Sequence, residues 1–245
     1  MIKILLLDIE TSPNSVHVWG LWQQNVSINQ IMESSRVLCW SAKWLGEKPI
    51  FFDSVNKSKE KDMLKKIHAL ISEADAVVHY NGTRFDMPTL NKEFLLNGMT
   101  PPSPYKQIDL LRTMKSQFRF PSNKLDYVAQ RLGLGAKTKH SGHELWVKCM
   151  NNDVASWKVM EKYNKQDVVL LEKVYEKILP WIKQHPNMNM YTEGYVCPTC
   201  SSSKIQRRGT NTTNAGVYQR YQCTDCGTWS QDKKNQKKVG IKHIV

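Results

Sequence analysis

The sequence predicts an α/β fold in which helices flank a mixed β-sheet, followed by a small C-terminal unit. Three observations predict it. Consecutive strand-like segments come first and later alternate with helical patterns, which is typical of a mixed sheet covered by helices. The length of 245 residues leaves room for one substantial domain and a smaller one. Four of the six cysteines fall within the last fifty residues, a segment too short for an adequate core without a metal ion.

Six strands are expected in the sheet. The first, residues 2–8, is a continuous apolar run that suits a strand buried on both faces. The others are short runs with an apolar or β-branched bias: residues 15–22, 36–45, 48–55, 76–80 and 105–110. The first four strands follow one another directly, which suits a meander.

Four helices are expected from apolar residues at helical spacing and from stop signals. Gly98 and Gly133 each end a helix, and Pro186 stops the last one. The predicted helices are residues 62–71, 87–97, 123–132 and 153–184. Together with the distribution of charge and cysteines, these elements predict four parts of the chain. They are a main domain (residues 1–185), a linker (186–195), a metal-binding unit (196–232) and a basic tail (233–245).

The charge is strongly basic and unevenly distributed. Lys and Arg number 35 against 22 Asp and Glu, which gives a net charge of +13, and the last fifty residues carry 9 basic and 2 acidic residues. Such a surplus favours a polyanion such as nucleic acid, although a solubilising surface is the alternative. No apolar stretch is long enough to span a bilayer and no signal-peptide pattern is present, so we expect no membrane partner and a cytoplasmic location.

Carboxylates stand at the ends of predicted elements. Asp8 and Glu10 lie two residues apart in a strand, so their side chains project from one face. Like charges this close favour a bound cation, and oxygen ligands favour Mg²⁺ or Mn²⁺. Asp86 begins a helix after a buried strand, where a capping role is the alternative. Tyr163 and Asp167 share one otherwise apolar helix face, and Tyr163 alone could be a core residue.

Three motifs carry a resemblance to a known family. Asp8-x-Glu10, Asn81-x-x-x-Phe85-Asp86 and Tyr163-x-x-x-Asp167 resemble the motifs of the DnaQ-like 3′–5′ exonucleases, in the form of the tyrosine subclass. The resemblance spans roughly residues 1–183. The chain is also similar to a group of phage and bacterial predicted exonucleases with a C-terminal zinc ribbon, through residues 18–21, 121–126 and 142–146.

The resemblance implies a ribonuclease-H-like fold and a metal-dependent 3′–5′ exonuclease that hydrolyses phosphodiester bonds. Asp8, Glu10, Asp86 and Asp167 would hold two Mg²⁺ or Mn²⁺ ions about 3.5–4 Å apart, one activating the attacking water and one stabilising the leaving 3′ oxygen. Tyr163 would orient or deprotonate that water. The expected substrate is nucleic acid with a free 3′ end, and DNA is favoured over RNA. The expected location is the cytoplasm of a bacterium, or the cytoplasm of the host cell if a phage encodes the protein.

Further residues are candidates for contact with nucleic acid. Asn81 and Phe85 belong to the second motif and would support the site or touch substrate. Lys137 and Lys139, with His140 and His143, form a cationic cluster that either contacts phosphate or is a solvated loop. His140 is an alternative base but lies in no matching motif. Asp109 would either support the site or cap the next helix.

Two Cys-x-x-Cys motifs, Cys197/Cys200 and Cys223/Cys226, are separated by 22 residues. Four thiolates at this spacing predict one tetrahedral Zn²⁺ in a zinc ribbon. A redox role is the alternative, and the duplication argues against it. Cys39 and Cys149 stand alone in apolar surroundings and are expected in the core.

Basic and aromatic residues are interleaved around the second cysteine pair. This pattern favours contact with nucleic acid through phosphate neutralisation and base stacking. The alternative is that the tyrosines pack the ribbon while the basic residues stay hydrated. The residues concerned are Arg207, Arg208, Tyr218, Arg220, Tyr221 and Trp229. A replication or repair protein is a further expected partner of the ribbon.

Two other functions fit the same fold. A structure-specific endonuclease would use the same carboxylates, and labelled oligonucleotide ladders would separate it from an exonuclease. A nucleic-acid-binding adaptor without catalysis would be favoured if a metal carboxylate were missing, yet all four are present.

Overall fold

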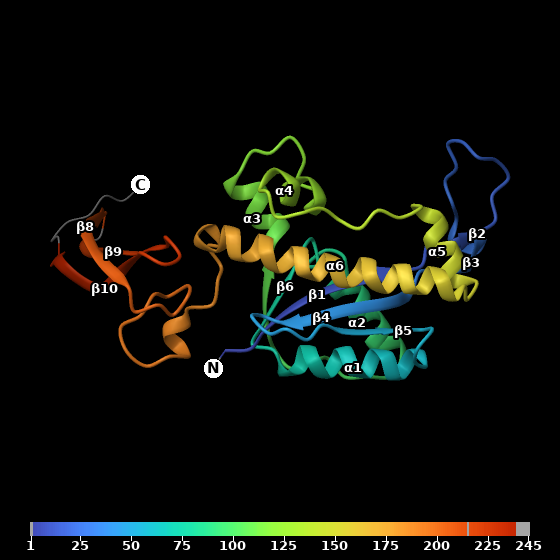
Figure 1. Ribbon diagram of the computed structural model, residues 1–245, viewed down its shortest axis with the longest axis horizontal. Coiled ribbons are helices and arrows are strands. Elements are labelled where there is room, and N and C mark those ends of the chain that lie inside the picture. Colours follow the sequence, from blue (N-terminus) through green and yellow to red (C-terminus); the bar gives the residue numbers. More distant parts are fainter. Residues whose placement is uncertain (1, 215, 239–245) are drawn as a thin grey trace. The chain divides into compact units, whose positions relative to one another are not determined.

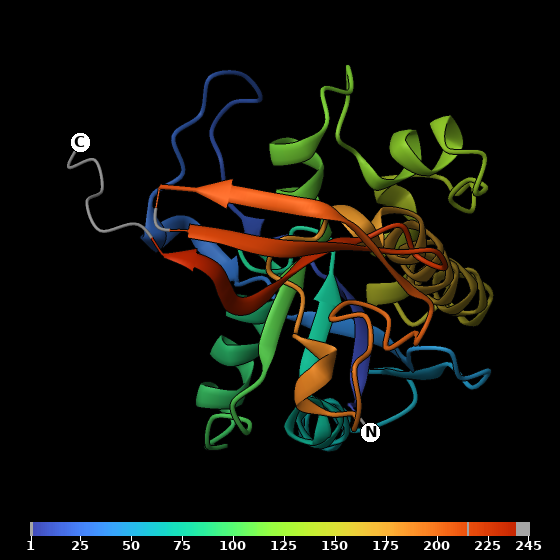
Figure 2. The same ribbon diagram turned by 90° about the vertical axis from the view of Figure 1, so that its left-hand side faces the viewer.

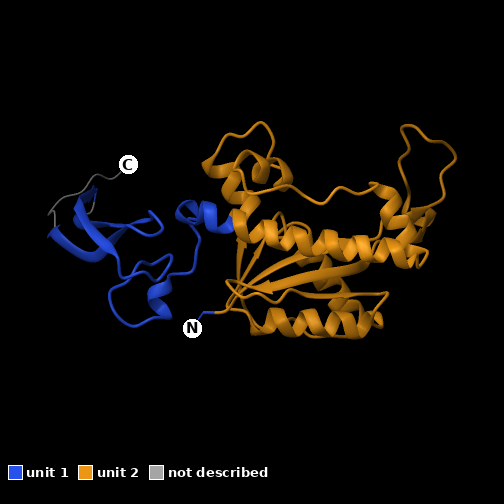
Figure 3. Cartoon of the chain, in the orientation of Figure 1, with its two compact units in different colours: residues 1–2, 175–245 blue, residues 3–174 orange. Residues whose placement is uncertain are grey.

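The computed structural model describes residues 2–214 and 216–238. The chain forms two compact units, one of residues 3–174 and one of residues 1–2 with 175–245 (Figure 3). The larger unit contains the five-stranded sheet and the helices that cover it. The smaller unit contains a three-stranded sheet and the four clustered cysteines.

The five-stranded sheet is mixed, with strand order β5-β4-β1-β6-β7. β1 is central and pairs antiparallel with β4 and parallel with β6. The strands are β1 (Ile4–Thr11), β4 (Val37–Trp44), β5 (Phe51–Ser54), β6 (Ala76–His79) and β7 (Lys106–Asp109). This arrangement confirms the predicted α/β class with a mixed sheet.

Helices cover both faces of this sheet (Figure 1). α1 and α2 pack on one face, whereas α5 and α6 pack on the other. The helices are α1 (Glu60–Glu73), α2 (Asp86–Leu96), α3 (Leu110–Gln117), α4 (Leu125–Arg131), α5 (His143–Met150) and α6 (Val154–Ile178). None of the helices in the described part of the chain has the length and apolar character needed to cross a membrane.

The alternation of side chains along β1 determines where the acidic residues point. Leu5, Leu7 and Ile9 are buried in the core formed with α1 and α2. Because side chains alternate across a strand, Asp8 and Glu10 project from the opposite face, where α6 packs. The strand therefore supplies core packing on one side and two carboxylates on the other.

The predicted strand over residues 15–22 is wrong for most of its length. Only β2 (Ser15–Val16) is a strand, and it pairs with β3 (Ile31–Glu33). The following aromatic residues stand in solvent, with exposed fractions of 101% for Trp19 and 83% for Trp22. β-branched and aromatic residues favour a strand only when a neighbouring strand supplies hydrogen bonds, and none pairs here among the described residues.

The smaller unit contains β8 (Ile205–Thr213), β9 (Gly216–Cys223) and β10 (Trp229–Lys238) in an antiparallel sheet with β9 in the centre (Figure 2). β10 continues past residue 232, where the sequence suggested that a basic tail begins. It does so because Asn235 and Lys237 pair with Tyr218 and Val217. Residues 239–245 of the expected tail lie outside the described residues.

Candidate active site

Three acidic side chains from two distant segments form a cluster. Asp8 and Glu10 extend from β1, and Asp167 extends from α6, which packs over that face of the sheet. One carboxylate oxygen from each lies within 4.8 Å of the other two. Asp167 is buried. The structure thus brings together three of the four predicted metal ligands.

Asp86 reaches the cluster indirectly. Its carboxylate accepts a hydrogen bond from the backbone N–H of Ile9 at 3.2 Å. Ile9 lies between Asp8 and Glu10 on β1. Asp86 does not belong to the group of three within 4.8 Å. α2 has Phe85 at its N-cap and no side-chain capping bond, so capping does not explain the buried Asp86. Phe85 itself is 45% exposed.

Asn164 supports the cluster and was missed by sequence reasoning. Its side-chain amide donates to Asp8 Oδ2 at 2.7 Å, and the residue is completely buried. Asn164 precedes Asp167 by one helical turn, so both face β1. The spacing of three residues between Asn164 and Asp167 could have predicted this role from the sequence.

The cluster has the chemistry of a cation site. Burial, and then repulsion from neighbouring carboxylates, raises the pKa of Asp8 well above its ordinary value and that of Glu10 to about 8. Burial also raises the pKa of Asp86 to about 7. Asp167 Oδ1 is buried and accepts no hydrogen bond from the described residues. Clustered carboxylates with an unpartnered oxygen fit a hard divalent cation.

Lys137 supplies a positive charge at the cluster. Its Nζ lies 2.5 Å from Asp167 Oδ2 and 3.1 Å from the hydroxyl of Tyr163. Burial alone would lower the pKa of Lys137, but the carboxylates of Asp167 and Asp8 outweigh it and raise that pKa. Asp126 fixes the segment by accepting from the Lys137 backbone N–H at 2.7 Å. The sequence predicted either a phosphate contact or a solvated loop for Lys137, and it did not predict this ion pair.

Tyr163 combines packing with a place at the cluster. Its ring is buried and lies edge-on to the rings of His140 and Trp146, at centroid distances of 4.7 and 6.0 Å. Burial, and then the charge of Asp167, raises the pKa of its phenol. A phenol with a raised pKa stays protonated near neutral pH, which favours a role in orienting a water over a role in deprotonating it.

The other three residues of the predicted cationic cluster differ from Lys137 in their exposure to solvent. Lys139, His140 and His143 are exposed, unlike Lys137. The Nδ1 of His140 accepts a hydrogen bond from the backbone N–H of Gly142 at 3.0 Å, so its second nitrogen carries the proton in the neutral ring. The side chain of Trp146, in the same stretch, hydrogen-bonds to the Glu10 carboxylate.

The turn after β6 is held by two close contacts. Asp109 Oδ1 accepts from the backbone N–H of Asn81 at 2.9 Å and of Leu111 at 3.0 Å. Asp109 therefore caps α3, as one of the two expectations had it, and it also holds the backbone at Asn81. A Cβ on Gly82 would lie 2.4 Å from Cγ of the buried His79, which restricts this position to glycine.

A cavity of about 610 Å³ opens beside the cluster and is called the Asp8 cavity here. Its lining includes Asp8, Tyr80, Asn81, Lys115 and Lys137. The Tyr80 hydroxyl donates to a backbone carbonyl of the segment before α4 at 2.6 Å, which closes one wall. Asp8 is thus accessible from a space large enough for part of a substrate.

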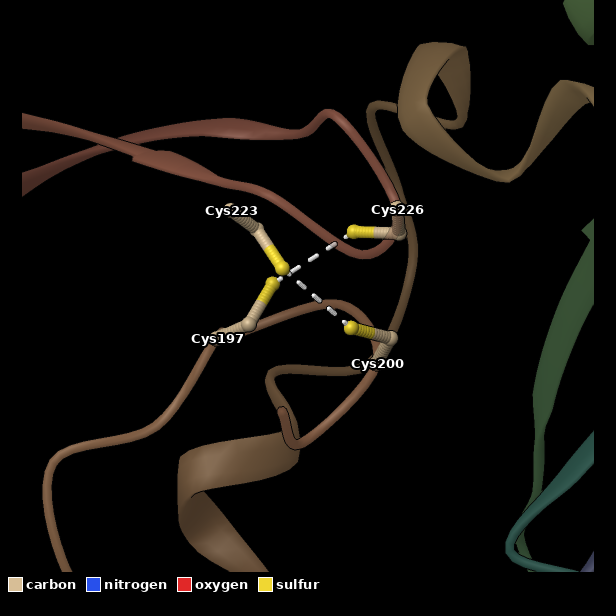
Figure 4. Close-up of side chains that lie close together, drawn as sticks. All are labelled: Cys197, Cys200, Cys223 and Cys226. Carbon is tan, nitrogen blue, oxygen red and sulfur yellow. Dashed lines mark hydrogen bonds between the residues drawn. The ribbon is translucent and has the colours of Figure 1, made fainter. Parts of the chain in front are cut away.

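The four cysteines of the smaller unit point toward one another (Figure 4). Their sulfur atoms lie within 4.8 Å of one another, with 3.6 Å between Cys197 and Cys226 and 3.7 Å between Cys200 and Cys223. The edge of a tetrahedron with zinc–sulfur bonds of about 2.3 Å is about 3.8 Å. The sulfur positions therefore fit one tetrahedral zinc ion, and the cluster is compatible with a zinc ribbon.

The basic and aromatic residues of this unit fall into two groups. Arg207 and Arg208 are exposed, and the guanidinium of Arg220 lies 4.7 Å from the centre of the Trp229 ring. Tyr221 is buried, and its hydroxyl donates to an aspartate on β10 at 2.9 Å. This arrangement favours the packing alternative for Tyr221, because its ring is not free to stack on a base.

The larger unit can be compared with known proteins. A family model of the RNase H superfamily matches residues 5–179, more than half of the chain. The chain belongs to the RNase H superfamily. This membership agrees with the mixed sheet and flanking helices, and it confirms the ribonuclease-H-like fold class. No curated protein sequence matches the chain.

A solved structure shares the RNase H superfamily fold of this chain. It is the family B DNA polymerase from the hyperthermophilic archaeon Pyrobaculum calidifontis, with a TM-score of 0.57 and 17% sequence identity. The match covers 74% of this chain but 25% of the polymerase chain. At this identity the likeness concerns the fold, and the matched region spans about a quarter of the polymerase.

Proposed function

We propose that the larger unit is a metal-dependent 3′–5′ exonuclease that hydrolyses phosphodiester bonds, with DNA as the substrate. The observation that carries the proposal is the cluster of Asp8, Glu10 and Asp167 in a chain of the RNase H superfamily. The DnaQ-like motifs of the sequence support the 3′–5′ direction. A replication or repair protein would be reached through the smaller unit.

The residues have distinct roles in this proposal. Asp8, Glu10, Asp86 and Asp167 would hold two Mg²⁺ or Mn²⁺ ions, which supply charge stabilisation for the attacking water and the leaving 3′ oxygen. Asn164 keeps the Asp8 carboxylate in place through its 2.7 Å hydrogen bond. Tyr163, with its proton retained, would orient the water.

Labelled oligonucleotides test the activity and its direction. Single-stranded DNA, duplex DNA and RNA, each labelled at one end, are incubated with Mg²⁺, Mn²⁺ or EDTA. A 5′-labelled strand should yield a ladder that shortens one nucleotide at a time, with no products in EDTA. Internal cuts without a ladder would indicate an endonuclease, and binding without cleavage would indicate an adaptor.

Two carboxylate variants test the site. Asp8→Ala and Asp167→Asn should lower the rate by more than about a thousandfold, because they remove charge that holds the cations. Asp62→Asn, an exposed carboxylate on α1, is the matched control. Full metal-dependent activity in either site variant would refute the proposed centre, provided that both variants keep the circular-dichroism spectrum of the parent.

The smaller unit is proposed to be a zinc ribbon that aids binding of nucleic acid. The exposed Arg207, Arg208 and Arg220 support this, since arginines on one sheet can neutralise backbone phosphates. A chain ending at Tyr195 should bind oligonucleotides more weakly and with a shallower salt dependence, yet still cleave them. An unchanged affinity and salt slope would defeat the assignment.

A further inference from the structure

A second cavity lies next to the Asp8 cavity. It has a volume of about 260 Å³, and Arg84, Arg112 and Lys115 line it. Asn81 and Lys115 also line the Asp8 cavity, so the two spaces share a wall. This second space is called the Arg112 pocket here. Its three cations therefore lie around a space next to the cavity that Asp8 lines.

The Arg112 pocket carries positive charge that the protein does not neutralise. Arg112 and Lys115 are three residues apart on α3 and share one helix face, and Arg84 comes from the turn after β6. All three side chains are exposed. Within residues 2–214 and 216–238, no carboxylate lies within 4.0 Å of these three cations.

The one acidic residue in the lining does not cancel this charge. Asp109 directs Oδ1 toward two backbone N–H groups, at 2.9 and 3.0 Å. Its carboxylate is therefore engaged within the protein and is almost completely buried. The pocket presents cationic donors to solvent, an arrangement that suits an oxyanion such as phosphate.

We infer that the Arg112 pocket binds a backbone phosphate of a polynucleotide strand whose scissile bond lies at the carboxylate cluster. This inference rests on the proposed exonuclease function. A 3′-terminal nucleotide has no phosphate beyond the scissile one, so a second phosphate site can hold only the chain on the 5′ side of the cut. The substrate class is therefore an oligonucleotide with at least two phosphates, and Arg84, Arg112 and Lys115 select it over a mononucleotide.

Binding measurements test this without cleavage. Arg112→Gln, Lys115→Gln and the matched control Lys61→Gln, an exposed cation on α1, are compared by fluorescence anisotropy with a short oligothymidylate in Ca²⁺. Each pocket variant should bind roughly tenfold more weakly. The salt slope should become shallower by about 0.7 for each phosphate of a single strand that the variant no longer neutralises. Lys61→Gln should match the parent, and melting temperatures establish that all variants fold.

A single-phosphate substrate separates chain binding from damage to the carboxylate cluster. The p-nitrophenyl ester of thymidine 5′-monophosphate carries no second phosphate. The ratio of kcat/KM for the oligonucleotide to that for the ester should fall roughly tenfold in Arg112→Gln. Equal losses on both substrates would overturn the inference, because the arginine would then act through the carboxylate cluster.

Other outcomes are equally decisive. Unchanged oligonucleotide affinity and salt slope in both pocket variants would overturn the inference. So would an equal loss of affinity for thymidine 5′-monophosphate, because the pocket would then hold a lone phosphate. If the parent binds oligonucleotide through the pocket but cleaves nothing, the proposed exonuclease fails while the phosphate site stands.

Discussion

The ammonium group of Lys137 contacts the carboxylate of Asp167 at 2.5 Å, so a side-chain cation lies against the acidic cluster. The pair spans two segments of the chain, the loop before α5 and the middle of α6. Its carboxylate is 1% exposed and its ammonium side chain 30% exposed. The ion pair therefore reduces the repulsion among the clustered carboxylates, and it also competes with any cation that binds them.

Replacing Lys137 should lower the stability of the metal-free protein but strengthen its binding of Mn²⁺. Breaking a buried ion pair costs roughly 3–5 kcal/mol, and the partial exposure of Lys137 reduces the expected loss to about 1–3 kcal/mol for Lys137→Gln in EDTA. Mn²⁺ should then bind more tightly, because its competitor is gone. Thermal unfolding against Mn²⁺ concentration measures both effects. Lys139→Gln, an exposed neighbour, is the control, and equal Mn²⁺ affinity in the two variants would contradict the prediction.

The metal-free protein should lose stability as the pH rises. Glu10 and Asp86 have pKa values raised to about 8 and about 7 in the folded chain. Carboxyl groups of an unfolded chain have pKa values of about 4, so the raised pKa values favour the folded state most below about pH 4. This contribution to stability is lost as the pH rises to about 8. Urea unfolding in EDTA from pH 5 to pH 9 should show this decline. A stability that increases over that interval would contradict it, and added Mn²⁺ should flatten the curve.

Removing one cysteine ligand should release the predicted zinc. Structural zinc contributes about 10–16 kcal/mol of apparent binding energy in small domains, so Cys226→Ser should lose the metal and unfold the smaller unit. Elemental analysis should find one zinc per parent chain and none in the variant. Limited proteolysis should then cut the smaller unit while residues 3–174 survive. Cys149→Ser, which alters a buried cysteine outside the cluster, should keep its zinc.

Gly82→Ala should destabilise the larger unit by about 1–3 kcal/mol, the usual cost of overpacking. The added methyl group would meet His79, which is completely buried among its neighbours. Gly20→Ala is the matched control, because there the nearest atom is the end of the flexible Gln24 side chain. Urea unfolding of both variants tests this. Equal stability of the two would mean that His79 is free to shift.

The sequence predicted the parts of the fold that have strong local patterns. β1, α1 and α6 contain apolar residues at clear strand or helix spacing, and the structure has elements there. α3 was missed because it begins directly after β7, with no linking loop to signal a new element. The prediction for residues 17–22 was wrong for the opposite reason: their composition favours a strand, but no strand among the described residues pairs with them.

The candidate site was predictable to a similar extent. Asp8 and Glu10 share a strand face, and Asp167 lies on a helix, so local spacing places each of them. The ion pair of Lys137 with Asp167 joins residues 30 positions apart, and no periodicity links them. The cations of the Arg112 pocket likewise converge only when α3 packs beside the turn after β6. Tertiary packing, and not local pattern, determines these contacts.

The bond from Asn164 to Asp8 joins residues 156 positions apart. Asp8 and Glu10 are synthesised before their partners on α6, which follow most of the larger unit. Domains acquire long-range contacts only when both segments are present. A nascent chain that lacks α6 therefore has no three-carboxylate cluster. The proposed nuclease activity could therefore begin only once α6 has been made.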